Sequence, residues 1–447
     1  MKHTVLNMTT RRGRMRALLA AALLMGASAP ALAETIAITN AKVYTVAQPG
    51  AFDGTVLIRD GRIAAVGANV AVPADARVID AGGKPVTPGI FAPFARIGIV
   101  EVDAVDQTND VGARESPVQA AISVADGFNP TATNIPVARI EGVTRAVIAP
   151  ESTKDVFGGQ GAIVSLGDGF NLIMRRDAFQ FAVLGEEGAE IAGGSRGAAY
   201  RILTNSLKEA QVYAENRARY RTNGGDREGL TNHVDADALG PVVRGEMPLM
   251  VRANAAQDLL QLIRLKQEFP KLRLIALGAA EGWRVADQLA AAKIPVILYA
   301  LDNLPTQFET MAATFSNAGR LQKAGVVVTL GMLDRAAHQP RLLLQHAGNL
   351  VGVGRTPGGV GLSWDEALAS ITLNPAKVFG MDKELGSLEV GKRADVVVWD
   401  GDPLELMSAP TAVFIDGTAI PLVSRQTMLR DRYLNLDEST LPVGYRR

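Results

Sequence analysis

Residues that could hold a metal are few in this chain. Its 447 residues include no cysteine, which excludes a thiolate nucleophile, a disulfide framework and a cysteine metal site. There are four histidines, namely His3 in the N-terminal segment and His233, His338 and His346 further along. Asp334 and His338, spaced i, i+4, could share one helix face, which is a weak metal signal. A zinc-activated water needs several nitrogen or oxygen ligands at fixed geometry, so the histidine count limits such a site from the start.

The elements that would position such residues alternate in the second half of the chain. Apolar stretches that read as strands are followed by stretches of helical character: strands at 249–253, 272–277, 295–299 and 326–330, and helices at 254–268, 282–292, 307–323 and 341–352. The strand starts are 23, 23 and 31 residues apart, which leaves room for crossover helices and implies parallel pairing. Ser363 and Glu366 form a capping box that predicts a helix running to about Asn374.

These elements predict a (β/α)8 barrel from about residue 87 to 384, with a doubly wound open sheet as the alternative. Its early half is less regular, with strands expected at 90–102 and 144–149 and a Gly-rich excursion at 158–174 that could be a hairpin. Both chain ends have strand character. At one end, 55–59 and 62–66 flank the turn Asp60-Gly61, and at the other the apolar stretches 394–399, 413–416 and 420–423 follow one another.

The first 33 residues have the pattern of an export signal. Basic residues up to Arg16 precede an apolar stretch at 17–29, and Ala31-Leu32-Ala33 fits the small-x-small cleavage rule, which leaves Glu34 as the mature N-terminus. The apolar stretch is short for a membrane span, although an uncleaved anchor is the alternative. A periplasmic protein is therefore expected, by either the general or the twin-arginine route. Residues 34–447 carry 41 basic against 46 acidic side chains, which does not favour nucleic-acid binding.

Short fragments at both chain ends carry a family likeness. They are Ile38-Thr39-Asn40-Ala41, Val86-Thr87-Pro88-Gly89, Leu373-Asn374-Pro375-Ala376-Lys377 and residues 385–402, LGSLEVGKRADVVVWDGD. In this order and spacing they resemble the amidohydrolase superfamily, in particular its imidazolonepropionase-like members. The resemblance implies a barrel at 87–384 and a composite β-sandwich built from 34–86 and 385–447. It also implies hydrolysis of carbon–nitrogen bonds other than peptide bonds, with one or two divalent metals such as zinc.

The positions that the resemblance assigns to metal ligands carry other residues. They correspond to Phe94 and Arg96 on the first barrel strand, Arg252 on the fifth, Gly278 on the next, and Leu333 on the eighth, with Asp334 one residue late. Phenylalanine cannot ligate a metal, and a protonated arginine repels a cation. No metal cofactor is therefore expected in this chain, in contrast to the family it resembles.

Arginine at two of those positions leads to a hypothesis about the barrel mouth. Arg96 and Arg252 could point into it, and either form a buried ion cluster with Asp334 or bind a carboxylate or phosphate. The alternative is that one or both turn outward to solvent. Glu281, Trp283 and Asp302 follow expected barrel strands, where active sites of this fold lie, and are further pocket candidates.

Three functions remain open at this point. The first is a metal-free, non-catalytic protein that binds a small-molecule ligand or a partner. The second is a hydrolase with an altered site in which Asp334 is the catalytic candidate and Arg96, Arg252, Glu281 and Asp302 bind substrate. The third is a subunit that supports an active amidohydrolase relative in a hetero-oligomer. A homo-oligomer is also compatible with the sequence, whereas nucleic acid and a membrane span after signal cleavage are not expected.

Overall fold

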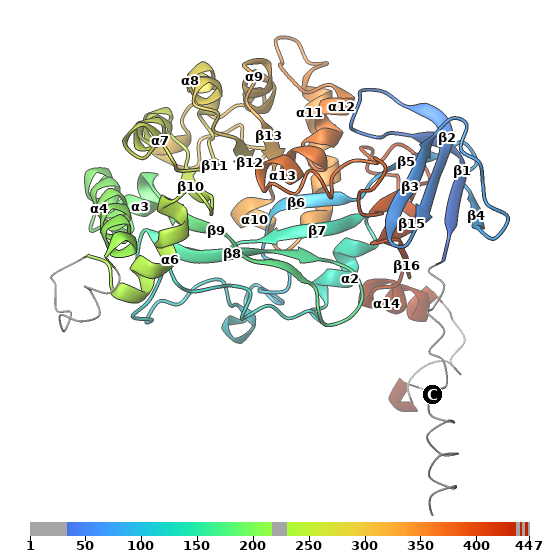
Figure 1. Cartoon of the computed structure of the whole chain (residues 1–447), viewed down its shortest axis with the longest axis horizontal. Coiled ribbons are helices and arrows are strands. Elements are labelled where there is room, and N and C mark those ends of the chain that lie inside the picture. Colours follow the sequence, from blue (N-terminus) through green and yellow to red (C-terminus); the bar gives the residue numbers. More distant parts are fainter. Residues whose placement is uncertain (1–33, 217–229, 435–438, 440–442, 446–447) are drawn as a thin grey trace, which may run out of the picture.

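An eight-stranded barrel forms the larger part of the molecule (Figure 1). The computed structural model describes residues 34–216, 230–434, 439 and 443–445, so the expected export signal lies outside the described residues. In spatial order the barrel strands are β6 (Ile90–Ala95), β7 (Val143–Ile148), β8 (Phe157–Ser165), β9 (Ile173–Val183), β10 (Leu249–Ala253), β11 (Leu274–Gly278), β12 (Val296–Leu298) and β13 (Val328–Leu330). Strand β13 returns to contact β6, so the sheet is nearly closed. The predicted α/β barrel is confirmed.

Regular β/α alternation is confirmed in the second half of the barrel. Strands β10 to β13 pair in parallel, and β10 has the predicted bounds. The helices that accompany them are α7 (Ala256–Glu268), α8 (Ala286–Ala291), α9 (Asn317–Lys323) and α11 (Leu343–Val353). The capping box of Ser363 and Glu366 forms, but the helix predicted to Asn374 divides into α12 (Trp364–Ala369) and α13 (Leu373–Val378). Pro375 has no N–H to bond the carbonyl of Ile371, which disfavours one continuous helix.

The first half departs from that alternation. Strand β8 runs antiparallel to both β7 and β9, so that the Gly-rich stretch forms a hairpin inside the barrel wall. The segment between Ile148 and Phe157 is shorter than the dozen or so residues that a parallel crossover needs. Glycine also permits close approach here, since a Cβ on Gly161 would lie 2.0 Å from the ring of Phe179 on β9.

Strands from both chain ends form a second, separate sheet, seen at the right of Figure 1. Its strands are β1 (Ile36–Val43), β2 (Phe52–Arg59), β3 (Arg62–Gly67), β4 (Arg77–Asp80), β5 (Pro85–Pro88), β14 (Val396–Trp399), β15 (Pro410–Ile415) and β16 (Thr418–Ile420). Strand β5 pairs with both β1 and β14 and so joins the two chain ends. Asp60 and Gly61 both have positive φ, at 52° and 74°, as a two-residue hairpin turn requires.

A buried ion pair connects the barrel to this terminal sheet. Arg145 on β7 donates two hydrogen bonds to Asp395, from Nε to Oδ2 at 2.6 Å and from Nη2 to Oδ1 at 2.7 Å. The same Nη2 lies 2.8 Å from Oδ1 of Asp416, which follows β15. The side chains of Arg145 and Asp395 are 1% and 6% exposed, so this contact is shielded from water.

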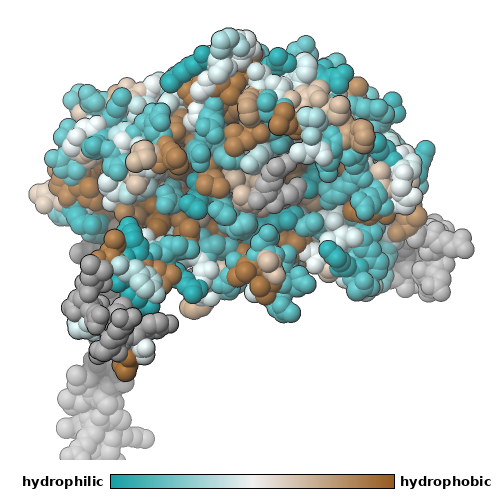
Figure 2. Space-filling model, turned by 180° about the vertical axis from the view of Figure 1, so that it is seen from behind, coloured by the Kyte–Doolittle hydropathy of each residue, from teal (hydrophilic) through white to brown (hydrophobic). Residues whose placement is uncertain are grey.

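Further helices cover the barrel and its edges. They are α2 (Asn134–Arg139), α3 (Gly185–Ile191), α4 (Arg196–Glu215), α6 (His233–Val243), α10 (Leu333–Ala336) and α14 (Arg425–Leu434), with 3-10 turns η1 (Asp106–Thr108), η2 (Gly282–Val285), η3 (Phe308–Thr310), η4 (Pro340–Leu342) and η6 (Val443–Tyr445). Among the described helices, none is both long and apolar enough to cross a bilayer. Figure 2 shows a mainly hydrophilic face with scattered apolar residues.

Candidate functional site

A cavity of about 320 Å³ lies at the end of the barrel where the parallel strands finish. Barrel enzymes carry their active sites at this end, because the loops that follow the strands converge there. The cavity is lined by side chains from the ends of three neighbouring strands and the segments that follow: Glu187, Arg252, Asn254, Gly278, Tyr299, Asp302, Thr306, Gln307, Glu309, Thr310 and Leu333. We refer to it below as the mouth cavity.

Arg252, on β10, provides a fixed positive charge in the wall of the mouth cavity. Its Nη1 lies 3.1 Å from Oε2 of Glu187 on α3, and its Cζ lies 5.9 Å from the ring centroid of Phe181. The Arg252 side chain is only 12% exposed. Contacts with a carboxylate and an aromatic ring hold the guanidinium plane, and a planar guanidinium can bind a carboxylate through two parallel hydrogen bonds.

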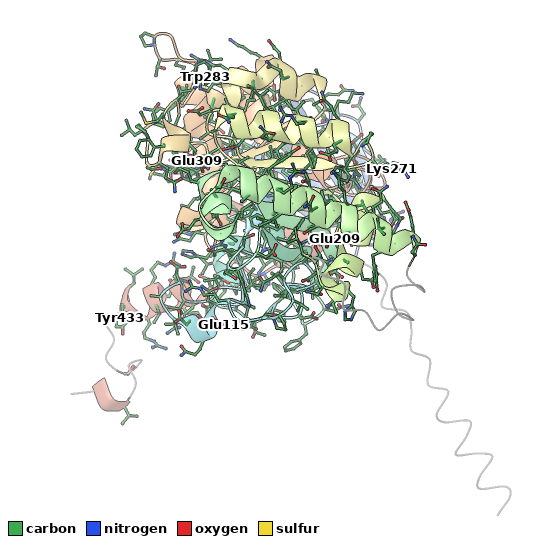
Figure 3. All side chains as sticks on the ribbon, turned by 90° about the vertical axis from the view of Figure 1, so that its left-hand side faces the viewer. Glu115, Glu209, Lys271, Trp283, Glu309 and Tyr433 are labelled. Atoms are coloured by element: carbon green, nitrogen blue, oxygen red, sulfur yellow. The ribbon has the colours of Figure 1, made fainter. Side chains whose placement is uncertain are left out.

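Glu309 is the most enclosed acid of the mouth cavity. It accepts hydrogen bonds from Nδ2 of Asn254 and from the N–H of Glu186, both at 2.7 Å, and it is 5% exposed. A Cβ on Gly185 would lie 2.3 Å from Glu309 Oε2, and Gly185 has a φ of +70°, so only glycine suits that position. Glu309, labelled in Figure 3, therefore orients Asn254 and fixes the start of α3.

A second buried carboxylate lies behind Glu309. Asp258, on α7, has its Oδ2 3.6 Å from Nε of Arg196 and is 5% exposed. Burial raises the pKa of Asp258, Arg196 opposes that shift, and the negative charge of Glu309 adds to it. Asp258 and Arg196 thus support, from behind, the part of the cavity wall that Glu309 lines.

Positions next to Arg252 have no room for further ligands. Phe94 on β6 is fully buried and packs against Phe181 with ring centroids 6.5 Å apart. Gly278, at the end of β11, has a φ of +91°, and a Cβ there would lie 2.3 Å from Oδ1 of Asn254. An imidazole at position 278 would therefore require both strain in the backbone and movement of Asn254.

Comparisons of the sequence with known proteins agree on one family. The signature of the amidohydrolase family matches residues 300–423. The chain is 25% identical over 398 residues to amidohydrolase tasK of Hapsidospora irregularis, covering 82% of this chain but only 40% of that protein. It is 24% identical over 371 residues to the imidazolonepropionase of Maricaulis maris, covering 78% of this chain and 88% of the relative.

The fold of a solved structure matches the fold of this chain over most of its length. The crystal structure of an amidohydrolase from Thermotoga maritima MSB8 superposes with a TM-score of 0.77 at 27% identity, covering 87% of this chain and 100% of that one. The chain belongs to the amidohydrolase superfamily. Membership of that superfamily suggests hydrolysis of carbon–nitrogen bonds.

Only some of the residues predicted from the sequence line the mouth cavity. Arg252 and Asp302 line it. Arg96 is not among its lining residues, and its Nη2 lies 3.0 Å from Oε2 of Glu151. Asp334 belongs to α10, next to Leu333 at the cavity wall, and its side chain lies outside what the structure describes.

Glu281 and Trp283 hold loops together beside the cavity. The carboxylate of Glu281 accepts hydrogen bonds from the N–H of Ala256 at 3.2 Å and of Ala312 at 3.0 Å. Trp283 donates from Nε1 to the carbonyl of Ala312 at 2.8 Å. Glu281 thus ties the start of α7 to the loop before α9, and Trp283 holds the same loop.

None of the three histidines that the structure describes lines the mouth cavity. His233 is exposed at the start of α6, and His338 lines a separate cavity with Glu101 and Arg341. His346, on α11, is buried edge-on against Tyr299 at 5.0 Å, and burial lowers its pKa to about 4. Within the described ranges, no group of three or more histidine, aspartate or glutamate side chains could hold a metal ion.

Several cavity residues were not singled out from the sequence. Asn254 directly follows β10 and Tyr299 follows β12, so their position at strand ends was a usable signal. Glu187 and Glu309 carry no such signal. They lie on α3 and η3, more than a hundred residues apart, and only the closed barrel brings both of them to the mouth cavity.

Proposed function

We propose that this amidohydrolase-superfamily protein binds a small carboxylate-bearing molecule in its mouth cavity without a divalent metal. The observation that carries the proposal is Arg252, which lies at a position where the family resemblance expects a histidine ligand and whose guanidinium is held in the cavity wall by Glu187. A guanidinium at that position repels a divalent cation, and it can bind a carboxylate through two parallel hydrogen bonds.

The surrounding side chains support this reading. A zinc site of the common kind needs imidazoles, but the matched positions carry Phe94, Arg96, Arg252 and Gly278. The acids nearby have other partners, since Glu187 pairs with Arg252, and Glu309 accepts from Asn254 and Glu186. These donors do not fit a divalent metal, so no hydrolytic step through a metal-bound water is assigned to them.

The size and polarity of the mouth cavity limit which ligands it could bind. A volume of about 320 Å³ is at the lower end of the range for small-molecule sites, and Asp302, Thr306 and Gln307 add polar groups opposite an arginine. The relatives named as imidazolonepropionases and amidohydrolases are enzymes of carbon–nitrogen bonds. An N-acylated amino acid combines an amide with a carboxylate, and its carboxylate would bind to Arg252.

Calorimetric titration with N-acetylated amino acids tests this proposal. We expect saturable binding that persists in a chelator and becomes at least about tenfold weaker in Arg252→Met, because a hydrogen bond to a charged group contributes about 1.5–3 kcal/mol. Arg264→Met, at an exposed position on α7, is the control with the same chemical change and should bind as the parent does. Near-stoichiometric zinc in the purified protein, or binding unchanged in Arg252→Met, would contradict the proposal.

Two other outcomes would replace it with another function. Turnover of the same compounds, insensitive to chelators and abolished by Asp334→Asn, would make the protein a hydrolase with an altered site. Stable co-purification with an amidohydrolase relative that retains its histidine ligands would make it a supporting subunit.

Export to the periplasm is part of the same proposal. Its support is the basic and apolar pattern of residues 1–33 with Ala31-Leu32-Ala33 at the end. We expect the protein recovered from the periplasmic fraction of an expressing bacterium to begin at Glu34, as N-terminal sequencing would show. Recovery of the uncleaved chain in the membrane fraction would favour the anchor instead.

A further inference from the structure

A second cavity, of about 420 Å³, lies at the opposite end of the barrel from the mouth cavity. It is formed where the parallel strands begin, by Pro248 before β10, Pro295 before β12, and Val326 and Val327 before β13. Figure 3 shows Lys271, two residues from a lining residue, on the far side of the molecule from Glu309. We call this second cavity the lower cavity; no function proposed above uses it.

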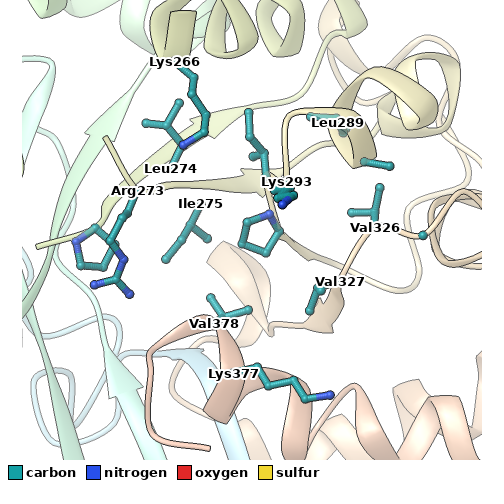
Figure 4. Close-up of a pocket in the computed structure, with 15 residues that line it drawn as sticks. Lys266, Arg273, Leu274, Ile275, Leu289, Lys293, Val326, Val327, Lys377 and Val378 are labelled. Carbon is teal, nitrogen blue, oxygen red and sulfur yellow. The ribbon is translucent and has the colours of Figure 1, made fainter. Parts of the chain in front are cut away.

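Four basic side chains surround the lower cavity. Lys266, Arg273, Lys293 and Lys377 come from α7, the segment before β11, the segment before β12, and α13 (Figure 4). No acidic residue is among the lining residues, and within the described part of the chain none of the four lies within salt-bridge distance of a carboxylate. The nearby carboxylate of Glu246 pairs with Arg244 instead. The lower cavity therefore has a concentrated positive charge that the carboxylates of the described residues do not neutralise.

Two of these cations are held by backbone oxygens. Lys266 donates from Nζ to the carbonyl of Leu272 at 2.7 Å, and Arg273 donates from Nη1 to the carbonyl of Glu246 at 3.5 Å. A carbonyl orients a cation without cancelling its charge, so both side chains remain available to an anion. Lys293 and Lys377 are exposed and flank the lower cavity from the barrel and from α13.

The interior of the lower cavity is apolar. Leu274, Ile275 and Val326 are each 3% exposed or less, and they form its floor together with Leu289 and Val378. Figure 4 shows Leu274, Ile275 and Val378 among the basic side chains. A ligand that satisfied this site would bury an apolar body on the floor and leave an anionic head among the cations.

We propose that the lower cavity is a binding site for a small amphipathic anion, a carboxylate on an alkyl chain of medium length. Charge complementarity selects the head group, because four cations in a lining that contains no acid favour an anion. The apolar floor selects the tail, and a volume of about 420 Å³ suits one small molecule. This site is independent of the ligand proposed for the mouth cavity.

The test is calorimetric titration of the purified protein with decanoate, beside decanol and decyltrimethylammonium. We expect one decanoate per chain, with decanol at least about tenfold weaker and no binding of the cation. Lys293→Glu and Lys377→Glu should each weaken decanoate at least about tenfold. Lys271→Glu makes the same charge change at an exposed position that does not line the lower cavity, and should leave the affinity within about twofold.

Different results would overturn the proposal. Equal binding of decanol and decanoate, or equal effects of Lys293→Glu and Lys271→Glu, would remove the role of the four cations. Loss of decanoate binding in Arg252→Met would place the ligand in the mouth cavity instead. Concentration-dependent dimers in sedimentation that Lys293→Glu dissociates would make this surface a contact between two copies. Should a Glu variant fail to fold, Lys293→Gln replaces it, with weaker decanoate binding again expected.

Discussion

Replacing Asp395 with alanine is expected to lower the free energy of unfolding by about 3–5 kcal/mol, because the change leaves a buried arginine without its main partner. Arg145 is 1% exposed and gives Asp395 two hydrogen bonds, at 2.6 and 2.7 Å. In Asp395→Ala only Asp416, which is 39% exposed on its side chain, stays within reach of that guanidinium. Urea unfolding followed by circular dichroism measures the loss.

A control at an exposed pair separates burial from ion pairing as such. Lys208 and Glu268 lie 2.6 Å apart with side chains 51% and 35% exposed, so Glu268→Ala should cost less than about 1 kcal/mol. The double change Arg145→Met with Asp395→Leu removes both charges, and should recover much of the stability that Asp395→Ala loses. Equal losses of unfolding free energy in Asp395→Ala and Glu268→Ala would show that burial does not increase the contribution of the Arg145 contact to stability.

The regular part of the barrel was predictable because its sequence signals are local. Each strand from β10 to β13 is a short apolar stretch followed by a helical pattern. The capping box of Ser363 and Glu366 marks the start of α12 through hydrogen bonds within one turn. The turn of Asp60 and Gly61 is local in the same way, since both residues tolerate positive φ. Such signals need no knowledge of the rest of the chain.

The antiparallel strand β8 depends on contacts that a local pattern does not reveal. Its glycines suggested a hairpin at 158–174, but not that this hairpin lies in the barrel wall, where Phe179 packs against the backbone of Gly161. The division of α12 from α13 is similar, because the capping box fixes where a helix begins and says nothing about where it ends. Both differences arise where packing between distant segments decides the local structure.

One residue of the candidate site, Arg252, was predictable, and the geometry of the site was not. Arginine at position 252 could be recognised against the family pattern, and the structure places it in the mouth cavity. Its partner Glu187 could not be recognised, because α3 follows the hairpin of β8 and β9, whose place in the barrel the sequence left open. The pairing of Arg96 with Glu151 likewise follows from the loop after β7, which carries no motif.

The second large effect concerns acid stability and His346. Burial lowers the pKa of His346 to about 4, below the ordinary value of about 6.5 for an unfolded chain. Between these two values the unfolded chain binds a proton that the folded protein does not, so stability falls as the pH falls through this window. His346 alone should account for a loss of about 2 kcal/mol between about pH 7.5 and about pH 5, rising toward about 3 kcal/mol near pH 4.

His346→Phe should therefore flatten the dependence of unfolding free energy on pH, because phenylalanine keeps a ring against Tyr299 and has no proton to gain. Nδ1 of His346 is buried without a hydrogen-bond partner, so the substitution removes no contact of that atom. His233→Gln, at the exposed start of α6, is the matched control and should keep the parental pH dependence. Urea unfolding at the two pH values compares the three proteins. An unchanged slope in His346→Phe would mean that the buried imidazole does not control acid stability, and that carboxylates such as those paired with Arg145 do so instead.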